Sequence, residues 1–257
     1  MTDLAESATS VLTRYAPVTA LALIALLMAV SFAASHWLTR GRVHGSAIAI
    51  LLGLVLAGLS GWATGGSRGV ADIECLVGVG LIGGAAFRDL AIVATAFGVR
   101  VSEFTRTGIS GVVALLLGVG LAFVCGAVVA YGFGYRDAVS MTTIGAGAAT
   151  YIVGPVTGTA IGASSEVIAL SVAAGLVKSV SVMVITPFVA KSIGLDNPRS
   201  ALVFGGLMGT TSGVAAGLAA TDERLVPYGA MTATFYTGLG CLLGPSFFFL
   251  AIRLLVG

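Results

Sequence analysis

The sequence TIGAGAATYIVGPVTGTAIGA, residues 143–163, decides the fold, because it is uncharged and largely apolar and yet contains five glycines, one proline and four threonines. Glycine and proline both disfavour the interior of a helix, and proline also removes one helical hydrogen bond. In hydrocarbon, irregular backbone is tolerated only where it is buried in protein or lines a water-filled cavity. The stretch therefore predicts a membrane segment that is broken at Gly154 and Pro155 and sheltered inside the protein.

The composition of the whole chain is that of a membrane protein. Hydrophobic residues make up 57% of the 257 residues, the mean hydropathy is +1.06, and only 9% of the residues are charged, against about 25% in soluble domains. Several uncharged runs reach the roughly 20 residues that cross a bilayer. We therefore expect an all-α, polytopic helical membrane protein with about eight membrane segments, folded as a single integral-membrane domain over residues 1–257.

The same sequence argues against several classes of function. The net charge of +2 gives no indication of nucleic-acid binding. No glycine-rich stretch is followed by Lys-Ser or Lys-Thr, so ATP is not expected to drive the protein. No nucleophile–base pair or metal-ligand cluster stands out, and we expect no enzymatic activity.

The apolar runs predict an order of spans. Residues 1–62 contain two N-terminal spans, and the loop between them, with Arg40 and Arg42, is expected to be cytoplasmic, which places the N-terminus in the periplasm. Farther on, a broken segment followed by a clean span recurs with a period near 60 residues, in the candidate repeats 75–132, 138–190 and 201–251. If each broken segment re-enters, successive copies are inverted, as in many secondary transporters. If each one crosses, the copies are parallel.

A charged residue inside one of these spans is the sharpest indication of a site. Lys178 lies near the middle of the span at 165–190, where a lysine costs about 3 kcal/mol on insertion scales and usually faces a cavity or a partner. Glu166 precedes it by twelve residues, about 18 Å along a helix, which is too far for contact. Lys178 is therefore expected to face a substrate or Asp89, with a structural ion pair as the alternative. Arg88 and Asp89 are adjacent, so on a helix they point in different directions, and one of them can face the pathway while the other pairs elsewhere. The alternative is that both mark a loop at the membrane edge.

The glycine-rich stretches supply further polar groups. Discontinuous membrane helices bind ions through freed backbone groups, and half-helix N-termini favour anions. The predicted substrate-binding residues are Lys178, Arg88, Thr150, Tyr151, Gly154, Thr210 and Thr211, and the predicted ion-binding residues are Thr157, Ser212 and Asp89. The alternative is close helix packing, for which glycines four residues apart, as from Gly205 to Gly217, are the usual pattern.

Several blocks of the sequence resemble the M subunit of the bacterial malonate transporter, the MadM family. The most specific are GYRDAVSMTTIGAGAATYIVGPVTG, residues 134–158, and GLDNPRSALVFGGLMGTTSGV, residues 194–214. The resemblance covers about residues 40–246. It implies a multi-pass protein of the bacterial inner membrane that imports malonate with sodium (Na+), together with a smaller L subunit. It assigns no role to any single residue.

Taken together, these features lead to one mechanistic hypothesis. Residues 143–163 and 201–220 meet near the middle of the membrane, form a joint site for malonate and sodium, and work by alternating access. Two alternatives stay open. One is an anion channel lined by the glycine faces, and the other is a scaffold subunit whose partner carries out the transport.

Overall fold

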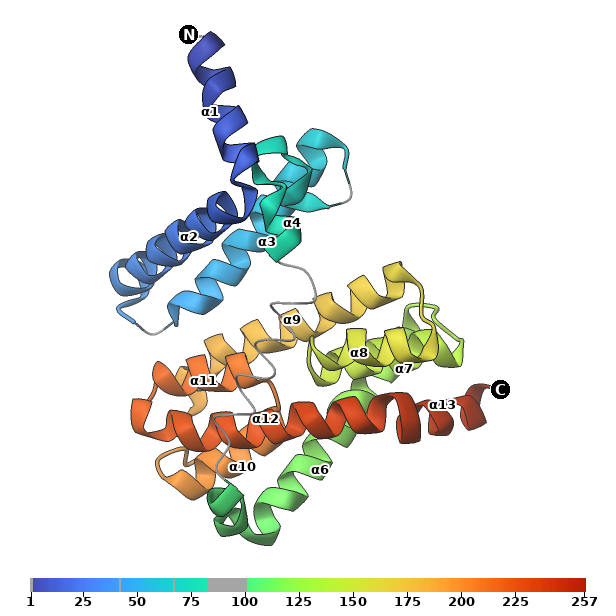
Figure 1. Ribbon diagram of the computed structural model, residues 1–257. Helices are drawn as coiled ribbons and strands as arrows, with labels where there is room; N and C mark the ends of the chain where they lie inside the picture. The colour runs from blue at the N-terminus through green and yellow to red at the C-terminus, as the bar shows by residue number, and fades with distance from the viewer. Residues whose placement is uncertain (1, 42, 67, 83–100) are drawn as a thin grey trace. The chain divides into compact units, whose positions relative to one another are not determined.

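The computed structural model describes residues 2–41, 43–66, 68–82 and 101–257, and the regular secondary structure within these ranges consists only of helices (Figure 1). The prediction of an all-α protein is confirmed. The chain forms two compact units, Met1–Phe97 and Gly98–Gly257.

Among the described residues, five helical stretches are long and apolar enough to cross a membrane: Ala16–Thr39, Gly45–Leu76, Gly108–Gly132, Ser165–Val189 and Glu223–Val256. The polytopic prediction is therefore confirmed. The predicted number of about eight membrane segments is not confirmed, because the two glycine-rich segments after Gly132 are divided into shorter helices.

The first unit is built around two antiparallel helices. Its elements are α1 (Thr2–Arg14), α2 (Ala16–Thr39), α3 (Gly45–Thr64) and α4 (Gly78–Ile82), with the 3₁₀ turns η1 (Gly69–Asp72) and η2 (Glu74–Leu76) before α4. Arg40 and Gly41 have positive φ angles of 52° and 76° and reverse the chain between α2 and α3. After this turn Gly45 lies against the ring of Phe32, so closely that a Cβ atom there would be 2.6 Å from the ring.

The second unit contains the glycine-rich segments. Its helices are α6 (Val101–Gly132), α7 (Ala138–Ala149), α8 (Val153–Ile161), α9 (Ser165–Val189), α10 (Pro198–Met208), α11 (Thr211–Ala219), α12 (Val226–Leu243) and α13 (Phe249–Val256), with a 3₁₀ turn η3 (Glu223–Leu225) before α12 and a π-helical turn η4 (Gly244–Phe248) after it. Long helices alternate with two pairs of short ones, α7–α8 and α10–α11. At 1.5 Å per residue each short helix is about 14–18 Å long, roughly half the thickness of the hydrocarbon core.

Each pair of short helices is one interrupted segment. α7 and α8 are separated by residues 150–152, and α10 and α11 by Gly209 and Thr210. The prediction that the first break lies at Gly154 and Pro155 is wrong. Pro155 is the third residue of α8, where a backbone N–H has no partner inside the helix, so proline is tolerated there.

The α7–α8 pair folds back on itself as a hairpin. A Cβ atom on Gly154 would lie 2.8 Å from the Cα atom of Gly147, and one on Gly158 would lie 2.7 Å from the Cγ2 atom of Thr143. Because later residues of α8 contact earlier residues of α7, the two helices are antiparallel. Glycines four residues apart thus serve close helix packing here, as small residues do in many membrane proteins.

The two interrupted segments reach α9 from its opposite ends (Figure 1). The α7–α8 segment leads into the start of α9, whereas the α10–α11 segment begins after the end of α9. Both breaks lie against the middle of this helix. A Cβ atom on Gly175 would lie 2.2 Å from the backbone nitrogen of Tyr151, and one on Gly213 would lie 2.8 Å from the carbonyl oxygen of Ser179. The breaks therefore meet near the centre of a long helix.

The loops that lead into α7 and α10 make the same backbone hydrogen bond, sixty residues apart. The N–H of Tyr135 donates to the carbonyl oxygen of Ala130 over 3.1 Å, and the N–H of Leu195 donates to that of Ala190 over 2.9 Å. In each loop the preceding glycine has a positive φ angle. The two loops thus have one geometry.

Each of these loops ends in a side chain that caps the next helix. The carboxylate of Asp137 accepts a hydrogen bond from the N–H of Ser140 over 2.8 Å, and the side-chain oxygen of Asn197 accepts one from the N–H of Ser200 over 3.0 Å. Aspartate and asparagine are among the best N-cap residues, because they satisfy a backbone donor that has no helical partner. The same local chemistry therefore starts α7 and α10.

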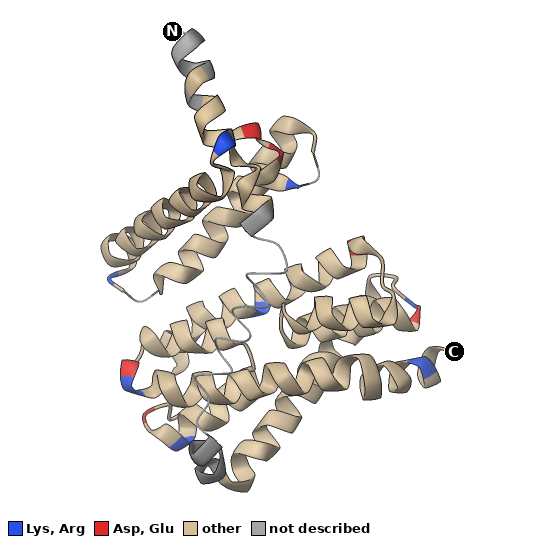
Figure 2. Cartoon of the chain, in the orientation of Figure 1, with Lys and Arg blue, Asp and Glu red and all other residues tan. Residues whose placement is uncertain are grey.

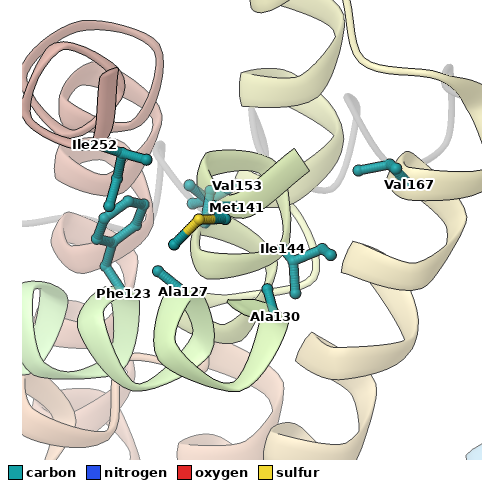
Figure 3. Close-up of a cluster of buried hydrophobic side chains, with 9 residues drawn as sticks. Phe123, Ala127, Ala130, Met141, Ile144, Val153, Val167 and Ile252 are labelled. Carbon is teal, nitrogen blue, oxygen red and sulfur yellow. The ribbon is translucent and has the colours of Figure 1, made fainter. Parts of the chain in front are cut away.

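A hydrophobic cluster holds the first hairpin in place. Figure 3 shows it where α6, α7, α8, α9 and α13 meet, and its labelled members are Phe123, Ala127, Ala130, Met141, Ile144, Val153, Val167 and Ile252. Phe123 also stacks on Phe248 with the ring centroids 4.1 Å apart. The cluster fixes α7 and α8 against both long neighbours and against the C-terminal helix.

Candidate functional site

Lys178 lies in the middle of α9. The other charged residues of the second unit lie mainly in loops and near helix ends, as Figure 2 shows, and Lys178 is the basic residue of α9. Its Nζ donates a hydrogen bond over 2.7 Å to the carbonyl oxygen of Ala149 and another over 3.2 Å to the hydroxyl oxygen of Tyr236. The same nitrogen lies 4.9 Å from the centroid of the Tyr236 ring, within the range of a cation–π interaction.

The interruption of the helix after α7 makes the Ala149 carbonyl available to this lysine. In a continuous helix the carbonyl of Ala149 would accept from the N–H of Val153. Instead, that N–H donates to the carbonyl oxygen of Thr150 over 2.9 Å, and the N–H of Gly154 donates to the same oxygen over 3.3 Å. The break therefore turns one backbone acceptor toward the ammonium.

Tyr236 joins the lysine to the second break. It is completely buried, on α12, and its hydroxyl donates to the carbonyl oxygen of Gly118 on α6 over 3.0 Å. Its ring lies against Gly209, where a Cβ atom would be 2.3 Å away and where φ is +68°. Glycine is required at this position for both reasons. One side chain thus contacts α6, α9 and the break between α10 and α11.

A cluster of hydroxyl groups lies at the second break. Thr210 caps α11, and its Oγ1 donates to the Oγ of Ser179 over 2.8 Å. The Oγ of Ser179 also lies 2.9 Å from the Oγ of Ser212. Thr210 and Ser179 are completely buried. Three hydroxyl oxygens from α9 and α11 therefore meet one residue beyond Lys178.

These two groups of atoms have different chemistry. An ammonium with backbone and hydroxyl partners is a compact positive charge that suits an anion. Hydroxyl oxygens are hard donors that suit a cation such as sodium. An ammonium and a cluster of hydroxyl oxygens thus lie at neighbouring positions in the middle of α9.

The family model for the malonate/sodium symporter MadM subunit matches residues 8–256. The chain belongs to the MadM family. It is therefore a subunit of a malonate/sodium symporter and a multi-pass membrane protein, and the resemblance stated from the sequence is confirmed. Family membership implies malonate as the substrate, sodium as the coupling ion and other subunits as partners. No curated protein and no solved structure matches the chain.

In this MadM-family chain, the residues predicted at the first break have different positions. Thr150 lies at the break, is buried, and accepts a hydrogen bond from the N–H of Ile152 over 3.4 Å. Tyr151 also lies at the break and is half-buried. Gly154 faces Ser171 of α9 rather than Lys178. Of the three, Thr150 and Tyr151 are next to the carbonyl that binds the lysine.

The residues predicted at the second break lie close together in the MadM-family chain. Thr210 and Ser212 belong to the hydroxyl cluster, and Thr211, the first residue of α11, is half-buried between them in the sequence. Thr157 lies elsewhere, on α8, where it faces Gly244. Its hydroxyl is buried and has no hydrogen-bond partner among the described residues.

Two predicted residues of this MadM-family chain, Arg88 and Asp89, lie outside the described residues. The prediction that Lys178 faces a substrate or Asp89 therefore stays a prediction. Among the described residues Lys178 has two hydrogen-bond partners that the sequence did not indicate, the Ala149 carbonyl and the Tyr236 hydroxyl. A lone tyrosine in the middle of an apolar span was the available signal for Tyr236. Ser179 had no signal of its own, because serine is common in membrane helices that pack closely.

Proposed function

We propose that this chain binds malonate beside Lys178 and carries it across the membrane by alternating access, coupled to sodium. The main support for the proposal is the position of the ammonium, which lies at the middle of α9 between the two helix interruptions. An ammonium has three N–H donors, and two of them have partners among the described residues, the Ala149 carbonyl and the Tyr236 hydroxyl. The third donor is available to a carboxylate oxygen, and the positive charge offsets part of the charge of a dianion.

Polar groups at the two breaks complete the proposed malonate site. In addition to Lys178 and Arg88, the proposed donors are Thr150, Tyr151 and Gly154 from the first interrupted segment and Thr210 and Thr211 from the second. A movement of either interrupted segment would change how many of these groups reach the substrate. Alternating access needs such a dependence, since the site must open to one side at a time.

We further propose that sodium binds at the hydroxyl cluster of Ser179, Thr210 and Ser212. Ser179 follows Lys178 directly, and successive residues on a helix point in different directions, so sodium and malonate occupy neighbouring faces of α9. The negative charge of malonate offsets the repulsion between the sodium ion and the ammonium. Each ligand then favours the binding of the other, which is the coupling that a symporter requires.

Thr157 and Asp89 are the other proposed ion ligands. For Thr157 the support is its orphaned hydroxyl, because a buried polar group without a partner is costly unless a ligand satisfies it. We place the chain in the bacterial inner membrane with a periplasmic N-terminus, as the basic loop at Arg40 favours. The smaller L subunit is the proposed partner.

The Lys178→Ala variant tests the malonate site. In proteoliposomes that contain the complete transporter, the variant should insert and fold but should no longer accumulate malonate when a sodium gradient is imposed. Lys191→Ala is the matched control, because Lys191 is exposed in the loop after α9. Normal accumulation by Lys178→Ala would remove Lys178 from the mechanism. Accumulation against a malonate gradient also separates a carrier from an anion channel, which only equilibrates its substrate.

A further inference from the structure

A cavity of about 770 Å³ lies between α9 and α10. On α9 its lining residues run from Lys178 to Val189, on α10 from Arg199 to Met208, and the intervening loop contributes the rest. Because that loop joins the two helices, it lies at one end of the cavity, and Lys178 lies at the other end, about 17 Å farther along α9. The cavity therefore connects a loop at the end of a membrane helix with the proposed malonate site.

The charged residues among those that line this cavity are both basic, Lys178 at the inner end and Arg199 at the outer end. The wall between them is mainly apolar and includes Ile185, Val203 and Leu207. Low-dielectric walls concentrate the field of nearby charges. The charges that line the cavity are therefore positive at both ends, which favours an anion over a cation.

The helices sixty residues earlier, α6 and α7, are closed against each other. They are the counterparts of α9 and α10, because the loops before α7 and α10 share their turn and their helix cap. A Cβ atom on Gly126 of α6 would lie 2.4 Å from the Cβ atom of Ala148, and one on Gly145 of α7 would lie 2.9 Å from the carbonyl oxygen of Phe123. The two equivalent pairs of helices thus differ: the cavity separates α9 from α10, whereas α6 and α7 are in contact.

We infer that the α9–α10 cavity is the open malonate path on the side of the 190–197 loop, and that the α6–α7 contact is the equivalent path, closed, on the opposite side. Transport then closes the first path and opens the second, with Lys178 between them. The substrate is the one named in the proposed function. The helices that form each path, the inverted relation between them and the side that is open are additional.

The first experiment measures access to the two paths with single cysteines. The native cysteines are replaced by alanine (Cys75, Cys125 and Cys241). Val203→Cys then probes the cavity wall. Ile144→Cys on α7 probes the closed contact, because Ile144 is buried in one cluster with Ala127 and Ala130 of α6. In sided vesicles that contain the complete transporter, a membrane-impermeant thiol reagent should label Val203→Cys from the side of the 190–197 loop and leave Ile144→Cys unlabelled.

Val177→Cys is the control for this labelling. Val177 is 67% exposed on α9 but does not line the cavity. It precedes Lys178 in the same membrane helix, so a water-soluble reagent that enters through the cavity should not reach it. Failure of Val203→Cys to react would overturn the inference, because a lipid or a partner helix then fills the cavity.

The second experiment shifts the balance between the two paths. Because the Cβ atom of a Gly126→Val variant would overlap Ala148, it should hold α6 and α7 apart. Labelling of Ile144→Cys should rise severalfold, from the opposite side, and labelling of Val203→Cys should fall. Gly120→Val is the matched control, because nothing lies within 4 Å of that position. A rise at both cysteines, which indicates general loosening, or a change at neither would overturn the inference.

Malonate separates the two parts of the proposal. Malonate with sodium should change the labelling of Val203→Cys in the otherwise unmodified chain and should not do so when Lys178 is alanine. If the reciprocal shift with Gly126→Val occurs and malonate has no effect, the paths are established and the proposed malonate site fails. If Lys178 is required for uptake and the reciprocal shift is absent, the site stands and the paths fail.

Discussion

Tyr236 of α12 donates a hydrogen bond over 3.0 Å to the carbonyl oxygen of Gly118 in α6, and its own oxygen accepts one from Lys178 of α9. A single phenol therefore connects three long helices at the level of the chain breaks. Tyr236 is completely buried, so water cannot replace either hydrogen bond, and the loss of one costs free energy of folding.

Tyr236→Phe is expected to lower malonate uptake and to destabilise the protein by about 0.5–1.5 kcal/mol, because it removes the hydrogen bond to the Gly118 carbonyl and one of the two partners of the ammonium. Thermal unfolding in detergent and sodium-driven uptake in proteoliposomes measure the two effects. Tyr228→Phe, near the start of the same helix, is the control. Equal behaviour of the two variants would mean that the Tyr236 hydroxyl contributes nothing.

Ser212→Ala is expected to raise the sodium concentration that gives half-maximal malonate uptake, because it removes one of the three oxygens of the hydroxyl cluster. The KM for malonate at saturating sodium should change much less. Ser246→Ala is the matched control, since the hydroxyl of Ser246 is bonded to the Leu242 carbonyl of its own helix. An unchanged sodium dependence in Ser212→Ala would exclude the cluster as the sodium site.

Gly147→Ala is expected to destabilise the protein by about 1–3 kcal/mol, as overpacking of a close contact does. A Cβ atom at this position would lie 2.2 Å from the carbonyl oxygen of Ser171, so α7 and α9 would have to separate. Gly120→Ala, on an open helix face, should be neutral or stabilise by up to about 1 kcal/mol through helix propensity. Thermal unfolding in detergent compares the two, and a smaller loss for Gly147→Ala than for Gly120→Ala would contradict the packing.

Asp137 makes the start of α7 sensitive to acid. Slight desolvation alone raises the pKa of its carboxyl, but the hydrogen bonds that it accepts from Ser140 outweigh this effect, and the pKa lies below its ordinary value. A lowered pKa in the folded state stabilises the protein above the pKa of the unfolded state, near 3.9, and this stabilisation is lost as the pH falls through the folded-state value.

Asp137→Ala should therefore destabilise the protein at neutral pH by about 0.5–2 kcal/mol, the usual contribution of a helix cap. Asp137→Asn should keep the cap and lose the dependence on acid. Thermal unfolding of both variants at neutral pH and near pH 3 tests this. A pH dependence that persists in Asp137→Asn would assign it to other carboxyl groups.

Local composition was sufficient to predict the helical class, the long spans and the existence of two interrupted segments. Apolar runs of a given length and clusters of glycine are properties of neighbouring residues, and the bilayer constrains them strongly. The prediction that Lys178 faces a partner or a cavity inside the protein has the same local basis, because a charge in the middle of a membrane span is costly.

The partners of Lys178 could not be predicted, because they come from distant parts of the chain. The Ala149 carbonyl is available only because the chain breaks at residues 150–152, whereas the sequence favoured a break at Pro155. A proline in the sequence is compatible with two structures, a broken helix interior or the first turn of a new helix, and the sequence does not distinguish them. Tyr236 is brought to the lysine by the packing of α12, which no local pattern specifies.

Neither α7 nor α8 is long enough to be held in a bilayer by itself, and their break offers polar backbone that lipid cannot satisfy. The ribosome delivers α6 before this hairpin and α9 after it. We therefore expect the hairpin to enter the hydrocarbon core only when both long helices are present to pack against it. Before that it should stay at the membrane surface. We therefore expect the second unit to insert cooperatively: a nascent chain truncated before α9 should leave the hairpin outside the lipid, where proteases can cleave it.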